Sequence, residues 1–366
     1  MQSRPIKNAG YLLALIPQML LVAGTYMDFP WLSVAFFFML LPLVRKFIGN
    51  DLSPPNRQLS PLLGTYLRAI PRLYCACWAL VLPWTMWILA TKPMSISQYV
   101  GFTLALWIVC SLNTAIGHEL IHSRSRFNRK LGDLLDATVG YFHFTEEHLS
   151  HHASNGSHDE SDAAVPGTSM YVFAFRRYMR SLRVAWSYES ARLKRTKSKW
   201  FANRLVGKLL ISIAIASAYF VVAGKVGLGI YLFQVAGAAF SVQAITYLQH
   251  WGLSEKTTPA MADYGYSWED GCWMQACVTL NHAFHGQHHL TIARPYYALS
   301  LNKGGLSLPA SYPVMFVVAL FPTFFTRLMK DRLAIWTANA ETGVDDSDCT
   351  GATKVVKALR DTQAPY

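Results

Sequence analysis

Histidine is unevenly distributed along this chain, and its spacing indicates metal binding. All 12 histidines lie between residues 118 and 289. On a helix, residues three or four positions apart project from the same face, so a short cluster can present its imidazoles together. Neutral imidazole is a ligand for iron, zinc, copper and nickel. Nine histidines fall in three such clusters and one isolated position: His118, His122, His148, His151, His152, His250, His285, His288 and His289.

The number of histidines limits the kind of metal site. One zinc ion takes three or four protein ligands, so nine imidazoles are too many for one ion and fit two. The six cysteines include no C-x-x-C pair, so neither a disulfide framework nor a four-thiolate iron site is encoded. Two metals held mainly by imidazole favour a non-haem di-iron centre.

Metal-bound imidazoles need partners that fix their orientation, and nearby carboxylates can serve as these partners. The same carboxylates would offset the positive charge of two divalent ions. A solvated acidic surface is the alternative for each of them. We select five acidic residues and one further histidine as candidate partners of the ligands: Glu119, Glu146, Glu147, Asp159, Asp162 and His282.

The elements that must position these histidines are membrane helices. The 366-residue chain is 52% hydrophobic and only 15% charged, whereas a soluble domain has about 25% charged residues. A signal peptide is the alternative for the first apolar stretch, but a second stretch follows at once and no clear cleavage site is present. The apolar stretches that can cross a bilayer, or nearly so, are approximately residues 11–26, 31–44, 73–90, 99–117, 205–224 and 227–248.

We therefore expect an all-α integral membrane protein with six transmembrane helices. A single domain would span residues 1–339, and residues 340–366 would form a polar C-terminal tail. Nearly all of the 33 Lys and Arg residues lie on the side that holds both termini and every histidine cluster. The positive-inside rule places that side, with its histidine-rich cap, in the cytoplasm, as in a bacterial inner membrane. Because this asymmetry explains the net charge of +12, we expect no nucleic-acid partner.

The helices below the histidines can enclose an apolar cavity. Residues 313–325 are too few to span the bilayer and are interpreted as a re-entrant or interfacial segment. The basic run at residues 192–197 is expected to contact anionic lipid headgroups, with docking of an acidic electron-transfer protein as the alternative. Helix packing or lipid contact is the alternative for each aromatic residue that can line the cavity. These aromatic residues are Trp78, Trp84, Trp87, Phe102, Trp107 and Phe240.

Four motifs resemble those of a known family. They read HELIH at residues 118–122, EEHLSHH at 146–152, LQHWGL at 248–253 and HGQHH at 285–289. Together they resemble the integral-membrane di-iron alkane and xylene hydroxylases of the membrane fatty-acid-desaturase superfamily. The resemblance covers roughly residues 65–330, and the motifs agree in order, spacing and placement after apolar spans.

The resemblance implies two irons held by the nine histidines, dioxygen as co-substrate, and hydroxylation of an unactivated C–H bond in an apolar substrate such as an alkane or alkyl-aromatic. It implies electrons from a rubredoxin or ferredoxin with its NAD(P)H reductase, since the chain has no flavin or nicotinamide fingerprint. The chain departs from the alkane hydroxylase pattern at three places. Phe284 replaces an Arg, Gly286-Gln287 replaces Ser-Asp, and Trp251 replaces a commoner Tyr.

Other functions stay open at this point. The same scaffold can desaturate a fatty-acyl chain or decarboxylate a fatty acid to a terminal alkene. Apart from Lys208 near the start of one span, the spans contain no charged residue that suggests a clamp for a carboxylate, which favours a hydrocarbon, although Arg294 lies near the last cluster. HELIH also matches the HExxH zinc-protease signature, with Glu119 as general base. A histidine-rich metal transporter would need polar residues midway through the spans, and these are nearly absent. We expect supporting or surface roles for His143 and His158.

Overall fold

Helices make up the regular structure of this protein in the residues that the structure describes, and only isolated β-bridges accompany them there. The structure is a computed structural model. Side chains of residues 4, 151–153, 259 and 338–342 lie outside its described part. The described residues are 4–51, 53, 55–56, 59–153, 163–254, 258–292 and 294–342.

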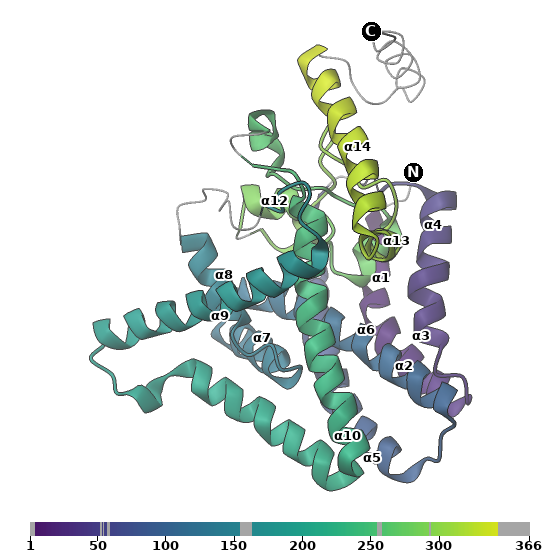
Figure 1. The fold of residues 1–366 in the computed structure, drawn as a ribbon, viewed down its shortest axis with the longest axis vertical. Coiled ribbons are helices and arrows are strands. Elements are labelled where there is room, and N and C mark those ends of the chain that lie inside the picture. Colours follow the sequence, from purple (N-terminus) through teal and green to yellow (C-terminus); the bar gives the residue numbers. More distant parts are fainter. Residues whose placement is uncertain are drawn as a thin grey trace.

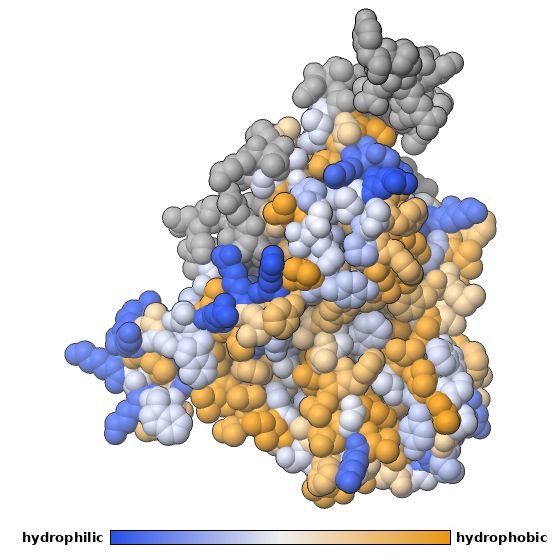
Figure 2. Space-filling model, in the orientation of Figure 1, coloured by the Kyte–Doolittle hydropathy of each residue, from blue (hydrophilic) through white to orange (hydrophobic). Residues whose placement is uncertain are grey.

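Four apolar helical stretches are long enough to cross a membrane. The first, Pro5–Tyr26, joins α1 (Arg4–Gly10), η1 (Tyr11–Leu15) and α2 (Ile16–Tyr26). The others are α5 (Pro61–Thr91), α6 (Ile96–Ile121) and α10 (Arg204–His250). In Figure 2 hydrophobic residues dominate the lower half of the visible surface, where α5 and the bend of α10 lie in Figure 1. The integral-membrane prediction agrees with this arrangement.

Gly224 divides α10 into two arms. Its φ of 64° and ψ of −155° are not helical, and glycine adopts this conformation without a Cβ penalty. The chain reverses there, and Figure 1 shows the two arms meeting at the bottom of the molecule. The arms correspond to the expected fifth and sixth spans. The second expected span, 31–44, falls in α3 (Leu32–Ala35), η2 (Phe36–Leu40) and α4 (Leu41–Ile48). This stretch is not among the four, so six crossings stay a prediction.

Two helices extend well beyond their apolar spans. α5 begins at Pro61 rather than at residue 73, because the Ser60 side chain accepts a hydrogen bond from the Leu63 N–H and caps the helix. α6 begins after a capping box formed by Ser95 and Gln98. It continues past residue 117 to Ile121, so it carries the first histidine motif on its last turn.

The remaining helices form the cap around the histidines. They include α7 (Arg126–Thr138), α8 (Phe144–Ala153) and the long α9 (Met170–Arg195), which leads through η3 (Trp200–Ala202) into α10. After α10 come η4 (Pro259–Tyr264), α11 (Trp273–Val278), α12 (His285–Leu290) and η5 (Tyr296–Ala298). The expected segment 313–325 divides between α13 (Tyr312–Ala319) and α14 (Pro322–Thr342).

A buried lysine joins the cap to the membrane helices. The Lys208 Nζ on α10 lies 3.0 Å from a carboxylate oxygen of Asp133 on α7, and it also contacts Glu146 on α8. A buried charge is costly unless it is paired in good geometry. Because two acids share this lysine, the position of α8 is set relative to both α7 and α10.

Candidate metal centre

The structure brings most of the predicted ligands into two groups. His118, His122, His148 and His288 form the first group. His250, His285 and His289 form the second. Within each group every residue offers a ring nitrogen within 4.8 Å of the others. His151 and His152 lie on α8 one turn beyond His148, but their side chains are outside the described residues.

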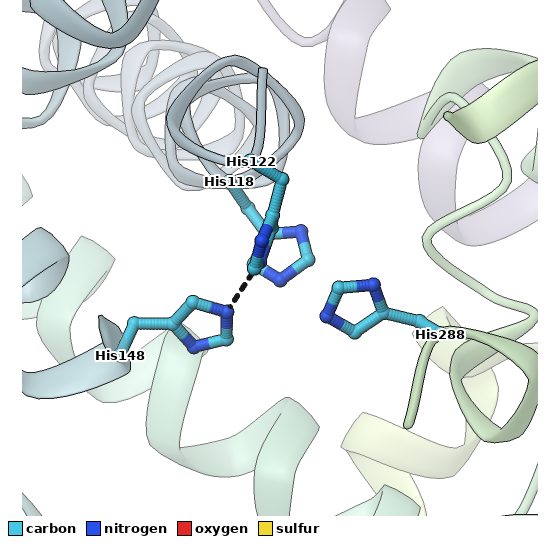
Figure 3. Close-up of side chains that lie close together, drawn as sticks. All are labelled: His118, His122, His148 and His288. Carbon is cyan, nitrogen blue, oxygen red and sulfur yellow. Dashed lines mark hydrogen bonds between the residues drawn. The ribbon is translucent and has the colours of Figure 1, made fainter. Parts of the chain in front are cut away.

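The first group is assembled from three helices. α6 supplies His118 and ends beside His122, α8 supplies His148, and α12 supplies His288. Figure 3 shows these rings pointing toward a common centre, with the Nε2 atoms of His122 and His148 2.7 Å apart. Two nitrogens on a tetrahedral metal, with bonds of about 2.0–2.1 Å, would be separated by roughly 3.3 Å. The group is therefore close to the size that one ion requires.

The second group lies where α10 meets α12. His250 is the last residue of α10, and its Nδ1–H donates to the Tyr266 backbone carbonyl at 2.9 Å. This bond fixes the tautomer, so Nε2 carries the lone pair that can bind a metal. On α12 the Nε2 atoms of His285 and His289 are 2.9 Å apart. One ion between these three rings would replace that contact.

The chemistry of these rings fits metal binding. Burial, followed by the charge of His282, lowers the pKa of His122 to about 4. Burial also lowers the pKa of His285 well below its usual value. Both rings are therefore neutral near pH 7, and neutral imidazole is the form that binds metals. The buried Nδ1 of His285 has no hydrogen-bond partner in the described part of the chain. A buried polar atom without a partner is unusual.

α12 carries ligands of both groups, and its position is fixed by close backbone contacts. The Glu269 carboxylate accepts hydrogen bonds from the backbone N–H of Gly286 at 3.0 Å and of Asn302 at 2.9 Å. Burial raises the pKa of Glu269 to about 8, against the effect of these donors. A Cβ on Gly286 would lie only 2.2 Å from the Tyr264 carbonyl oxygen. Only glycine therefore fits at this position.

The departures from the alkane hydroxylase pattern have structural explanations. Gly286, where the family has Ser, is required by the approach of Tyr264. Phe284, where the family has Arg, is fully buried, and Lys7 places its ammonium 5.2 Å from the ring centre. Trp251 packs edge-on against Phe325, with ring centres 5.8 Å apart. The Trp251 departure therefore changes packing and adds no atom to either histidine group.

The predicted carboxylate partners have different surroundings from those expected. The Glu119 carboxylate accepts a hydrogen bond from the backbone N–H of Tyr296, and neither residue belongs to a histidine group. Glu146 pairs with Lys208, as described above. Glu147 lines the cavity beside His148 and lies 3.5 Å from a nitrogen of Arg177. The role of Glu147 as a partner of His148 therefore stays a prediction. Asp159 and Asp162 lie outside the described residues, as does His158.

His282 lies between the two groups. Its ring centre is 4.7 Å from that of His118 and 5.4 Å from that of His285. Leu280 and Asn281, just before it, both have positive φ, at 49° and 57°, a conformation that costs energy in non-glycine residues. The Asn281 side chain stabilises this turn by donating to the Tyr11 hydroxyl at 2.8 Å and to backbone carbonyls. His143 instead lies 3.0 Å from the Ser181 hydroxyl, in a supporting position.

A cavity of about 220 Å³ opens onto both groups. Of the six aromatic residues expected to line it, only Trp107 does. Phe240 packs against Phe316 and Tyr171 instead, while Trp78 donates to Thr138. Sequence reasoning missed several lining residues, because they come from helices that meet only in three dimensions. These residues are Phe37, Phe38, Arg177, Gln249, Gln275, Thr279, Tyr312 and Phe316.

Comparison with known proteins places this fold and site in a family. The fatty acid desaturase family matches residues 94–317, more than half of the chain. The protein therefore belongs to the fatty acid desaturase family.

The chain is similar to monooxygenases that are named for alkane and xylene substrates. Alkane 1-monooxygenase 1 of Alcanivorax borkumensis is 29% identical over 81% of this chain and 76% of its own length. Alkane 1-monooxygenase of Ectopseudomonas oleovorans is 28% identical with the same coverage. The xylene/toluene monooxygenase hydroxylase component XylM of Pseudomonas putida is 23% identical over 65% of this chain and 66% of its own.

Proposed function

We propose that this protein is a membrane monooxygenase that hydroxylates an unactivated C–H bond of an apolar substrate, an alkane or alkyl-aromatic. One observation carries the proposal. Two groups of convergent imidazoles open onto one largely apolar cavity, in a chain similar to alkane 1-monooxygenases. Two irons are the metals we assign, with His151 and His152 completing a set of nine ligands.

The protein residues divide the work of this reaction. When bound, the two irons supply dioxygen activation and removal of a hydrogen atom from carbon. One oxygen atom of dioxygen is inserted into the C–H bond. The other is reduced to water by two electrons from the donor and two protons. The imidazoles hold the irons in place, and the apolar cavity orients the substrate and excludes bulk water. Electrons come from a separate rubredoxin or ferredoxin with its NAD(P)H reductase.

The cavity favours slender hydrocarbons. An engineered apolar cavity of about 150 Å³ holds one benzene molecule, so about 220 Å³ admits a ring with a short alkyl group or an alkane of similar bulk. The cavity follows α6 from Trp107 to His118, a distance of about 16 Å at the helical rise per residue. We therefore expect the substrate to lie along α6 with its reacting carbon near His118.

The surroundings of the site support this reaction over its alternatives. Decarboxylation of a fatty acid would need a cation for the carboxylate. Arg294 bonds to Gln287, and the charge of Arg177, which lines the cavity, is already balanced by Glu147 at 3.5 Å. A zinc protease would need Glu119 at the metal, whereas it bonds to Tyr296. We retain the single domain of residues 1–339 and the polar tail of 340–366. We also propose that the chain crosses an inner membrane six times, with the active site and both termini in the cytoplasm.

Metal analysis joined to product analysis tests the proposal. The protein is purified in detergent, its iron and zinc are quantified, and it is supplied with dioxygen, a reducing system, and an alkane, an alkylbenzene or a fatty acid. We expect about two irons per chain and an alcohol from a hydrocarbon. His118→Ala should lose iron and product, and His143→Gln should keep both. One zinc without oxygen consumption, or an alkene and carbon dioxide from the fatty acid, would contradict the proposal.

A further inference from the structure

A second cavity, an apolar groove, lies between α9 and the first arm of α10, away from the two histidine groups. Its volume is about 480 Å³. Seven of its eight lining residues are apolar or small, and the eighth is Arg183. The lining is formed by Phe142, Leu182, Arg183, Trp186, Ser187, Leu205, Val206 and Leu209.

The first arm of α10 is exposed to its surroundings on most sides. Only 22% of the residues in the most apolar stretch of α10 are buried, whereas 67% are buried in the corresponding stretch of α6. Figure 1 shows α9 and this arm extending from the body and meeting at the turn between them, as the two sides of a V. Near the tip, the Glu189 carboxylate joins them by accepting hydrogen bonds from Arg192 at 2.6 Å and from Arg204 at 2.8 Å. An apolar groove between such helices in a membrane is filled by lipid chains.

The positive charge along α9 favours a lipid with an anionic headgroup. Residues 170–203 contain nine basic residues and one acidic residue, Glu189, which is already paired. In Figure 2 hydrophilic residues follow the course of α9, and hydrophobic residues lie below it over the first arm of α10. This boundary is the arrangement expected where a helix lies at the membrane surface. Basic residues at that level attract anionic headgroups.

Arg183 connects the apolar groove to this charged boundary. It is exposed, lines the groove, and forms no ion pair or hydrogen bond with any residue in the described part of the chain. Trp186, one helical turn further on, is 52% exposed and lines the same groove. An arginine and a tryptophan at one level match a phosphate above an acyl chain.

We propose that an anionic phospholipid of the surrounding bilayer occupies this groove. Its phosphate pairs with Arg183, and one acyl chain lies on Leu182, Trp186 and Leu209. Phe142, which also lines the groove, is two residues before α8, the helix that carries His148. The lipid therefore braces the junction between the membrane arm and the cap, independently of the reaction at the histidines.

Native mass spectrometry of delipidated full-length protein tests this proposal. Phosphatidylglycerol or phosphatidylcholine of equal chain length is titrated in, and one bound lipid per chain is followed. We expect the wild type to prefer phosphatidylglycerol. Arg183→Gln should weaken that binding about five-fold, the effect of one basic residue at a membrane surface. Trp186→Ala should weaken both lipids equally, because it removes only apolar contact.

Two further variants keep the test decisive. Arg176→Gln removes a charge that is also exposed and lies on the same helix outside the groove, and this variant should bind like the wild type. Arg183→Lys keeps the charge and should keep the preference, which covers the case that the glutamine variant misfolds. The proposal is overturned if the wild type shows no preference for phosphatidylglycerol, or if Arg176→Gln and Arg183→Gln lose the same affinity.

Discussion

Substituting Gly286 by Ala tests how strictly α12 is positioned. The new Cβ would lie 2.2 Å from the Tyr264 carbonyl oxygen and must retreat by about 1.2 Å to reach the 3.4 Å of ordinary contact. Metal–ligand distances are acceptable only within about 0.2 Å, so α12 cannot shift this far and still hold both ions. The second group takes two of its three described ligands from α12, and the first takes one of four.

The expected result is selective loss of metal from an otherwise folded protein. Iron should fall from about two per chain toward one, because the first group keeps three of its described ligands. Overpacking should cost about 1–3 kcal/mol of stability. Gly207→Ala is the matched control: nothing lies within 4 Å of its added Cβ, and it should stabilise α10 by about 0.5–1 kcal/mol. Iron content and Tm measure both variants. Wild-type iron and Tm in Gly286→Ala would refute this reasoning.

Three more predictions follow from other contacts. Lys208→Met removes the nearest cation from the buried Glu146 carboxylate and from the partly exposed Asp133. Breaking a buried pair costs about 3–5 kcal/mol, so we expect a lower Tm, whereas Lys225→Gln at an exposed position should change nothing; equal Tm values would contradict this. Trp107→Ala enlarges the cavity and should shift turnover toward bulkier hydrocarbons at constant iron, a prediction that an unchanged product profile would refute. Burial would raise the pKa of Glu189, but hydrogen bonds from Arg192 and Arg204 lower it to about 2. The resulting stability is complete above pH 4.5, the ordinary value, and is lost as pH falls toward 2. The Tm difference between wild type and Glu189→Gln should shrink below pH 4.5, and a constant difference would contradict the assignment.

The arrangement of the predicted ligands could be inferred from sequence because helical spacing fixes which side chains share a face. His118 and His122 are four residues apart at the end of one helix, and both reach the same group. The division of α10 into two arms was also readable, because residues 205–224 and 227–248 form two separate apolar runs. By contrast, the distribution of α12 ligands between both groups depends on how that short helix packs, which spacing does not encode.

The partners of the ligands could not be inferred, because proximity in sequence is not proximity in space. Glu119 follows His118 directly, but consecutive side chains diverge around a helix, and its carboxylate meets Tyr296 instead. Glu146 is near His148 in sequence, yet it is occupied by Lys208 from a distant helix. The position of His282 depends on a left-handed turn at Leu280 and Asn281, and leucine gives no sequence signal for such a turn.

Turnover of a hydrocarbon under isotopically labelled dioxygen tests the central claim most directly. The protein, loaded with iron and supplied with an electron donor, is given an alkane or alkylbenzene, and the product is analysed by mass spectrometry. We predict an alcohol that carries one oxygen atom from the labelled gas in nearly every molecule. An alcohol without label, or an alkene as the main product, would contradict hydroxylation at this centre.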